Sequence, residues 1–228
     1  MVFKRIFNKR TIKRIEDKVN LLGVSSKYDA ITLLSVRLIT LVLLFVVVFS
    51  TFKHGYILAI VFVILYYFLF EYIMLDNKIK KREKIINNEA IYFFEVLTLS
   101  LQTGRNLAEA ISVTVNSIDG QLSLEFKEAI RETKFGKSLT ESLNDMQKRI
   151  PSDSVNNIIL ALTQANIYGS SIISTLNNQI DYLRERRKME IKAQISKVPT
   201  KISIISVFFF IPLILLIILG PVLLKYIG

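Results

Sequence analysis

Three stretches of the chain are almost continuously apolar and long enough to cross a lipid bilayer. They cover residues 31–51, 56–75 and 202–224. At a rise of about 1.5 Å per residue, about 20 residues span the roughly 30 Å of a hydrocarbon core. The helices of a soluble core keep a polar side, whereas these stretches are apolar all round. The pattern predicts an integral membrane protein with a transmembrane helical hairpin (31–75) and a C-terminal transmembrane helix (202–224).

Between the second and third stretches, residues 76–201 are polar with apolar residues at helical spacing. No segment there alternates with the period of two that is typical of a strand. The expected helices cover residues 76–101, 107–117, 122–135, 139–149, 154–168 and 172–197. Short turns between six helices favour an antiparallel bundle, so the predicted fold class is all-α.

One turn pattern occurs three times between these helices: a Gly, then two residues later an Asn or Ser, then an apolar residue. The three turns are Gly104-Arg105-Asn106, Gly136-Lys137-Ser138 and Gly169-Ser170-Ser171. Gly can end one helix in the left-handed conformation, and the Asn or Ser side chain can accept from a free amide at the start of the next. Asn106 with Glu109 has the spacing of a capping box, and so does Ser138 with Glu141.

Residues 1–30 place apolar side chains at near-helical spacing among eight Lys and Arg residues. This pattern predicts a basic amphipathic helix or helix pair that ends near Gly23. The interpretation we favour is that it lies on the membrane surface against anionic lipids. The alternative is that it binds the acidic groove of a partner.

The distribution of Lys and Arg predicts the orientation of the chain in the membrane. Basic residues collect in 1–30 and 76–201, and they are nearly absent from the turn 52–55 and from the residues after 224. Cytoplasmic segments carry the excess of basic residues. We therefore expect the N-terminus and the bundle in the cytoplasm, the C-terminus outside, and a multi-pass protein of the inner (cytoplasmic) membrane. This topology also accounts for the net charge of +11, so we do not expect nucleic-acid binding.

No pattern typical of catalysis or cofactor binding is found in the sequence. The chain has no Cys, and its single His, His54, lies in the predicted outside turn without a second ligand nearby. None of the eight glycines belongs to a phosphate-binding motif. We expect a protein that is not an enzyme and that needs no metal or cofactor.

Charged residues inside predicted spans are costly and are therefore candidates for function. Arg37 and Glu71 lie at similar depth from the cytoplasmic ends of the first two spans. They could form an intramembrane ion pair across the hairpin, or each could extend separately to the headgroups.

Proline within the third span predicts an irregularity in that helix. Pro212 lies inside the span, and Gly220-Pro221 lies at its outer end. A kink there would leave a carbonyl group free, either for a partner helix or simply as a consequence of packing.

Glu125, Glu128 and Glu132 share one face of a predicted helix, beside Lys127 and Arg131. Such a composition is typical of a solvated helix surface. An acidic docking face is the alternative.

Three segments in the second half of the chain carry a family resemblance. They are FFEVLTLSLQTGRNLAEAI, KFGKSLTESLNDMQKRIP and ILALTQANIYGSSIISTLNNQIDYLRERRKMEIKAQISKVP. In their order and spacing they resemble the type II secretion system F family, the inner-membrane platform proteins of type II secretion and type IV pilus assembly. Many members have two copies of the helical bundle, whereas this chain has one after a hairpin. It is therefore more similar to the tight-adherence (Flp) pilus proteins of the TadB and TadC type.

The resemblance implies a non-catalytic scaffold and its partners. A cytoplasmic assembly ATPase would dock on the bundle, and pilin or pseudopilin subunits would be inserted from the membrane. The chain would pair with itself or with a paralogous platform subunit. The competing hypothesis is a membrane-bound sensor or signalling protein with a helical output domain, although the outside turn is very short for sensing.

Overall fold

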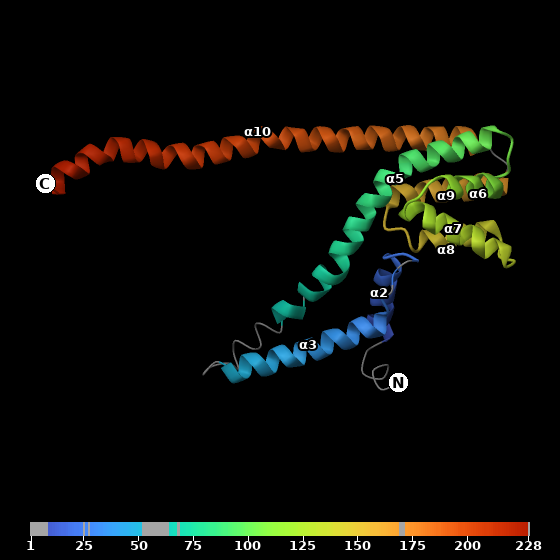
Figure 1. Ribbon diagram of the computed structural model, residues 1–228, viewed down its shortest axis with the longest axis horizontal. Coiled ribbons are helices and arrows are strands. Elements are labelled where there is room, and N and C mark those ends of the chain that lie inside the picture. The colour runs from blue at the N-terminus through green and yellow to red at the C-terminus, as the bar shows by residue number, and fades with distance from the viewer. Residues whose placement is uncertain are drawn as a thin grey trace. The chain divides into compact units, whose positions relative to one another are not determined.

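The computed structural model describes residues 9–24, 26, 28–51, 64–67, 69–168 and 172–227 (Figure 1). Within these ranges every regular element is a helix and no strand occurs, so the predicted all-α class is confirmed. The chain divides into two units, residues 1–180 and 181–228.

The N-terminal helix of the described chain is amphipathic, as its pattern predicts. Helix α2 (Lys9–Asn20) is followed by Gly23, whose φ of +88° ends the segment. Helix α3 (Ala30–Thr51) follows. The apolar side of α2 does not face outward, because Ile15 and Val19 are buried against Leu34 and Leu75. Apolar surface of the same chain therefore covers these two residues, and the location of the segment on the membrane surface stays a prediction.

Two helices in the described part of the chain are long and apolar enough to cross a membrane, Ala30–Ser50 and Ile172–Leu219. The first corresponds to the first predicted span and the second contains most of the third. Of the second predicted span, the structure describes helical residues 64–67 and 69–71 and a π-helical turn, η1 (Tyr72–Asp76). The all-α fold with membrane helices therefore agrees with the prediction, and the turn with His54 lies outside the described residues.

Five helices and the start of a sixth build the bundle. They are α5 (Asn77–Gln102), α6 (Leu107–Ser117), α7 (Gln121–Lys134), α8 (Leu139–Gln147), α9 (Asp153–Tyr168) and the first residues of α10 (Ile172–Ile227). From α5 to α9 each helix packs on the next, and α5 also packs on α7 and α9. The limits of α5 to α9 and the start of α10 lie within two residues of those expected, whereas α10 continues to Ile227 instead of ending near residue 197.

Three phenylalanines from two helices form the centre of the bundle. Phe93 and Phe94 of α5 and Phe126 of α7 are almost completely buried. The rings of Phe93 and Phe126 stack with centroids 4.6 Å apart, while Phe94 meets Phe126 edge-on at 6.1 Å. Such aromatic pairs add to the free energy gained by burying apolar area. The bundle is thus a packed core that can support charged groups at its edge.

The helix turns have the conformations that their sequence requires. Gly104 and Gly136 have φ of +85° and +95°. Asn106 caps α6 by accepting from the Glu109 amide, and Ser138 with Glu141 forms a complete capping box on α8. At Asn106 the structure gives only this half of the box. Gly169 and Ser171 lie outside the described residues.

Helix α10 begins in the bundle and continues without a break to Ile227. Within the first unit, Leu176 and Ile180 are buried. Within the second unit, the backbone stays helical through Pro199, Pro212 and the Gly220-Pro221 step. The helix is not interrupted at these positions, but an unbroken helix can still bend at a proline. A kink at Pro212 or at Gly220-Pro221 therefore stays a prediction.

Candidate functional site at the junction of the bundle and the N-terminal segment

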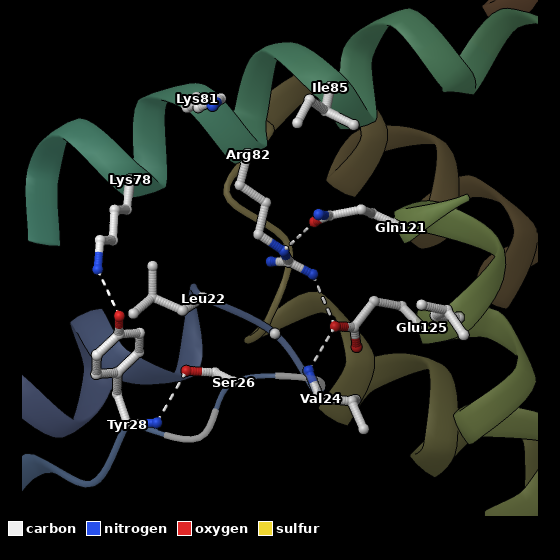
Figure 2. A pocket seen from close by; sticks show the side chains of 12 residues that line it. Leu22, Val24, Ser26, Tyr28, Lys78, Lys81, Arg82, Ile85, Gln121 and Glu125 are labelled. Atoms are coloured by element: carbon white, nitrogen blue, oxygen red, sulfur yellow. Dashed lines mark hydrogen bonds and ion pairs between the residues drawn. The ribbon is translucent and has the colours of Figure 1, made fainter.

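Arg82 of α5 is a buried charge where the N-terminal segment meets the bundle. Its side chain is 7% exposed. Its nitrogens donate to Gln121 Oε1 at 3.0 Å and to Glu125 Oε1 at 2.7 Å (Figure 2). They also donate to the carbonyls of Leu21 at 2.7 Å and Arg149 at 2.6 Å. Arg82 thus joins α5, the start of α7, the turn after α8 and the segment after α2. Burial lowers the pKa of its guanidinium, and the negative charge of Glu125 opposes that change.

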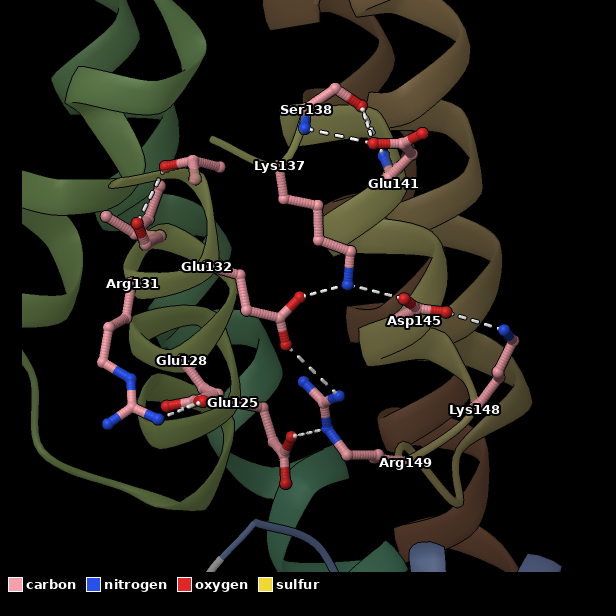
Figure 3. A network of polar contacts seen from close by, with 12 residues as sticks. Glu125, Glu128, Arg131, Glu132, Lys137, Ser138, Glu141, Asp145, Lys148 and Arg149 are labelled. Carbon is pink, nitrogen blue, oxygen red and sulfur yellow. Dashed lines mark hydrogen bonds and ion pairs between the residues drawn. The ribbon is translucent and has the colours of Figure 1, made fainter. Parts of the chain in front are cut away.

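Glu125 of α7 is the counter-charge of this junction. Its side chain is 2% exposed. Oε1 accepts from Arg82 and from the Val24 amide at 2.9 Å, and Oε2 accepts from Arg149 Nε at 2.8 Å (Figure 3). A buried carboxylate is tolerated only when it is paired and hydrogen-bonded, and both oxygens of Glu125 meet that condition.

The prediction that all three glutamates of α7 form a solvated surface is wrong for Glu125. Glu128 pairs with the exposed Arg131, and Glu132 pairs with Lys137 (Figure 3). Glu125 is instead covered by residues that are about 100 positions away in sequence, such as Val24. The spacing of the glutamates indicates a shared face, but it carries no information about which part of that face another segment covers.

Gly23 allows the backbone to approach the buried pair. Besides its positive φ, a Cβ atom at this position would lie 2.3 Å from Arg82 Nη2 and 2.6 Å from Glu125 Oε1. Atoms cannot approach so closely. Any other residue would therefore displace either the N-terminal segment or the paired side-chain ends of Arg82 and Glu125.

A second close approach caps the start of α7. Gly120 precedes this helix and offers no side-chain cap. Glu89 of α5 supplies it, since its Oε2 accepts from the Leu122 amide at 2.9 Å. A Cβ atom on Gly120 would lie 2.7 Å from that oxygen. Negative charge at a helix N-terminus is favourable, so this contact also stabilises α7 against α5.

A charge network on α7 and α8 extends from the junction to the surface (Figure 3). Asp145 accepts from Lys137 Nζ and Lys148 Nζ, each at 2.6 Å. These two hydrogen bonds, that from Lys137 foremost, lower the pKa of Asp145 to about 2. The bonds to Asp145 and Glu132 raise the pKa of Lys137.

On the opposite side of the junction, α2 is attached to the residues around η1 by ion pairs. Arg14 Nη2 lies 2.6 Å from Glu71 Oε1, and Lys18 Nζ lies 2.7 Å from the same atom and 2.8 Å from Asp76 Oδ1. The hydrogen bond to Glu71 raises the pKa of Arg14. Burial disfavours the charge of Lys18, but its bonds to Asp76 and Glu71 outweigh burial and raise its pKa. The acidic groove considered as an alternative partner of this basic helix is thus supplied, in part, by the same chain.

Arg37 and Glu71 do meet, but not as an isolated pair. Arg37 Nη1 lies 3.8 Å from Glu71 Oε2, which is longer than the contacts of Glu71 with α2. Arg37 also donates to the Tyr67 carbonyl at 3.0 Å, and its guanidinium carbon lies 3.7 Å from the centroid of the Tyr67 ring. Both side chains are largely buried. Two side chains that extended separately to the headgroups would instead be exposed.

Arg82 and Arg149 were not among the candidates derived from the sequence. Glu125 was expected on a solvated or docking face, and Gly23 only as a helix end. Arg82, Glu125, Arg149 and Gly23 come from four different parts of the chain. A weak signal was available in two cases. Glu125 stands three residues after the buried Leu122, and Arg82 stands four before the buried Ile86, so each occupies a position of an apolar stripe. A charge in such a position is a candidate for a buried pair.

The junction attaches separate parts of the chain to one another. Its interactions join opposite charges to one another and to backbone groups. Within the described ranges, no group of three His, Asp or Glu side chains could hold a metal ion. The fold and the site thus define a class: an all-helical membrane protein whose bundle is fixed to its N-terminal segment by buried charges.

Comparison with known proteins identifies the family. Residues 93–220 match the model of the family described as Type II secretion system (T2SS), protein F. This match covers more than half of the 228 residues, and the chain belongs to this family. Its members are platform proteins of type II secretion and type IV pilus-type machines. No curated protein and no solved structure gave a match.

Proposed function

We propose that this protein is a non-catalytic inner-membrane platform that couples a cytoplasmic assembly ATPase to the insertion of pilin or pseudopilin subunits. The observation that carries the proposal is the family match, which runs from α5 through the whole bundle into the apolar part of α10. A platform needs a cytoplasmic part that receives movement and a membrane part that uses it. The matched residues include both.

The junction supplies a mechanical connection for this role. Arg82 and Glu125 fix the segment that precedes α3 to α5, α7 and the end of α8. Buried charge pairs are costly to separate, because each charge would be left without a partner in a low-dielectric interior. Movement of the bundle would therefore be passed on to the start of α3 instead of being lost in a flexible linker.

In this proposal the membrane helices provide the surface for the substrate. Side chains such as Leu43, Phe49, Phe208 and Leu216 are exposed and apolar. A pilin or pseudopilin carries a hydrophobic helix that must leave the bilayer, and apolar helix surfaces can contact it without a polar penalty. A kink at Pro212 would add a free carbonyl group for that contact.

The orientation and the subtype belong to the same proposal. The N-terminus and the bundle lie in the cytoplasm, the protein crosses the inner membrane three times, and the C-terminus lies outside. The single bundle after a hairpin favours a subunit of the tight-adherence (Flp) type, paired with itself or with a paralogous platform subunit. A sensor or signalling role, the competing hypothesis, is not favoured by the family match.

Co-purification with the ATPase tests the proposal. The full-length chain is solubilised in mild detergent from its own cell, and the assembly ATPase is measured in the purified fraction. Gly136→Pro is the variant that disrupts the bundle, because a φ of +95° is incompatible with proline. Asp153→Pro is the matched control, because Asp153 is the first residue of α9, where proline is tolerated.

We expect the ATPase with the wild-type chain and with Asp153→Pro, and a strong loss with Gly136→Pro. Circular dichroism of each purified chain reports whether its helices have formed. Recovery of the fully helical wild-type chain without the ATPase would contradict the proposal.

A further inference from the structure

A cavity of about 420 Å³ lies beside the junction, between the segment after α2, the start of α5 and the start of α7 (Figure 2). Its walls are of two kinds. Leu22, Val24, Ile85 and Leu124 give it an apolar side. The remaining lining is mostly polar or cationic.

The polar side of the cavity carries an excess of positive charge. Lys78, Lys81 and Arg82 all line it. Its only acidic lining residue, within the described part of the chain, is Glu125, and Arg82 and Arg149 both bind that carboxylate. Glu125 therefore adds little repulsion toward a bound anion.

Two of the cationic side chains differ in their availability. Lys78 Nζ donates to the Tyr28 hydroxyl at 2.6 Å and lies 4.3 Å from the centroid of that ring. Lys81, one turn further along α5, has no hydrogen bond or ion pair to the described residues and is exposed. Lys81 is thus a free cation at the edge of a cavity that is already positive.

The cavity adjoins the predicted membrane boundary on both sides. Tyr28 lies two residues before α3, the first membrane-long helix. Lys78 and Lys81 lie three and six residues after Leu75, where the second predicted span ends. At about 1.5 Å per residue, Lys81 lies at most about 9 Å from that end along the helix, close to the outer edge of a headgroup layer that is roughly 5–8 Å deep on each side.

We propose that this cavity binds the phosphate group of an anionic phospholipid, with Lys81 as its principal contact and Lys78 and the Tyr28 hydroxyl beside it. Ammonium groups bind phosphate as point charges, and a phenol can donate a hydrogen bond to it. The apolar wall would contact the glycerol and the first methylenes of the lipid, a contact that free phosphate does not need. The bound lipid would hold the N-terminal segment to the bundle at the membrane surface.

The test is a lipid titration of the full-length chain in detergent micelles, followed by native mass spectrometry. Phosphatidylglycerol is the anionic probe and phosphatidylcholine with the same acyl chains is the neutral one. Lys81→Gln removes the free cation. Lys84→Gln is the matched control, because it removes the same charge from the next turn of α5 but does not line the cavity.

We expect the first phosphatidylglycerol to bind several-fold more tightly than phosphatidylcholine. Lys81→Gln should weaken it about fivefold, as expected for one lysine near an anionic headgroup, and Lys84→Gln should leave it unchanged. Equal binding of the two lipids, or an equal effect of the two variants, would overturn the proposal. Thermal unfolding of both variants without added lipid verifies that neither has lost its fold.

Competition with inorganic phosphate distinguishes a site for free phosphate from a site for the phosphate group of a lipid. If millimolar phosphate displaces phosphatidylglycerol from the wild type but not from Lys81→Gln, the cavity binds phosphate in general. If phosphatidylglycerol stays bound, the acyl part contributes and the ligand is the lipid.

Discussion

Arg82, Glu125 and Arg149 place three charges at the edge of an apolar core, and each of them depends on the others. Glu125 has the least exposed side chain of the three and accepts from both arginines. When one partner of a buried ion pair is removed, the other charge remains buried and uncompensated. Variants that remove one charge should therefore lower the free energy of unfolding by unequal amounts. The amount depends on how deeply the remaining partner is buried and not on the charge alone.

Glu125→Gln should lower the free energy of unfolding by about 3 kcal/mol, because it leaves the Arg82 guanidinium buried without its counter-charge. The measurement is denaturant-induced loss of helical signal from the full chain in detergent. Glu128→Gln is the matched control on the same helix. Its partner Arg131 is 66% exposed, so we expect a change below about 1 kcal/mol. Similar losses for both variants would show that the junction does not stabilise the bundle.

Gly23→Ala and Gly104→Ala distinguish two reasons why a position requires glycine: its positive φ and the lack of space for a Cβ atom. Both positions have nearly the same φ, +88° and +85°, but an added Cβ meets Arg82 at Gly23 and open space at Gly104. The backbone conformation alone should cost each variant about 1 kcal/mol. Gly23→Ala should cost clearly more, because either the segment or the buried pair must also shift to admit the Cβ atom. The same denaturant experiment measures both, and equal losses would mean that the close approach is unimportant.

The short helices are stabilised by their capped ends and by the faces that pack on neighbouring elements, more than by their own helical sequence pattern. Helix α8 is short, and its start is held by the Ser138 and Glu141 capping box. Its middle is attached to the α7–α8 turn by Lys137 and Asp145. Helix α2 shows the same dependence on neighbours, since its apolar face is covered by α3 and the end of η1. Short helices of this kind are stable only in contact with other elements.

The contact of Asp145 gives α8 a defined pH dependence. The pKa of Asp145 is lowered from 3.8 to about 2. A lowered folded-state pKa contributes stability that is complete above 3.8 and is lost as the pH falls toward 2. Asp145→Asn should therefore reduce the fall in thermal midpoint of the full chain across this window. The change should be small, because Asp145 is 40% exposed.

Lys148→Gln provides the graded comparison for this experiment. It removes one of the two hydrogen bonds to Asp145 and leaves the bond from Lys137. The thermal midpoint should then show a pH dependence between those of the wild type and Asp145→Asn. An unchanged profile in both variants would mean that other groups govern acid unfolding.

For the whole molecule, the distribution of basic residues predicts the orientation that the proposed platform role requires. The chain has no cysteine, so single cysteines report their own side of the membrane without a background. Lys53→Cys and Lys225→Cys, in segments predicted to lie outside, should react with a membrane-impermeant maleimide in intact cells. Lys134→Cys, in the bundle, should react only after permeabilisation. Labelling of Lys134→Cys in intact cells would reverse the topology and exclude contact with a cytoplasmic ATPase.

Much of the architecture follows from the sequence because it depends on local properties. Apolar length predicts the membrane helices, helical spacing predicts the limits of α6 to α9, and turn chemistry predicts the caps at Asn106 and Ser138. These features involve residues that are close in sequence, so periodicity and capping rules apply to them directly. The family resemblance adds one further feature, the order in which these segments follow one another.

Which residues meet at the junction follows only from the tertiary structure. Whether Glu125 is a surface carboxylate or a buried one depends on Val24, which is 101 positions away. Whether the apolar face of α2 contacts lipid or protein depends on where Leu34 and Leu75 lie. Sequence patterns specify which side of a helix is apolar and which residues are charged. Which segment covers them is the outcome of packing between distant parts of the chain, and that packing decides which charges are buried and paired.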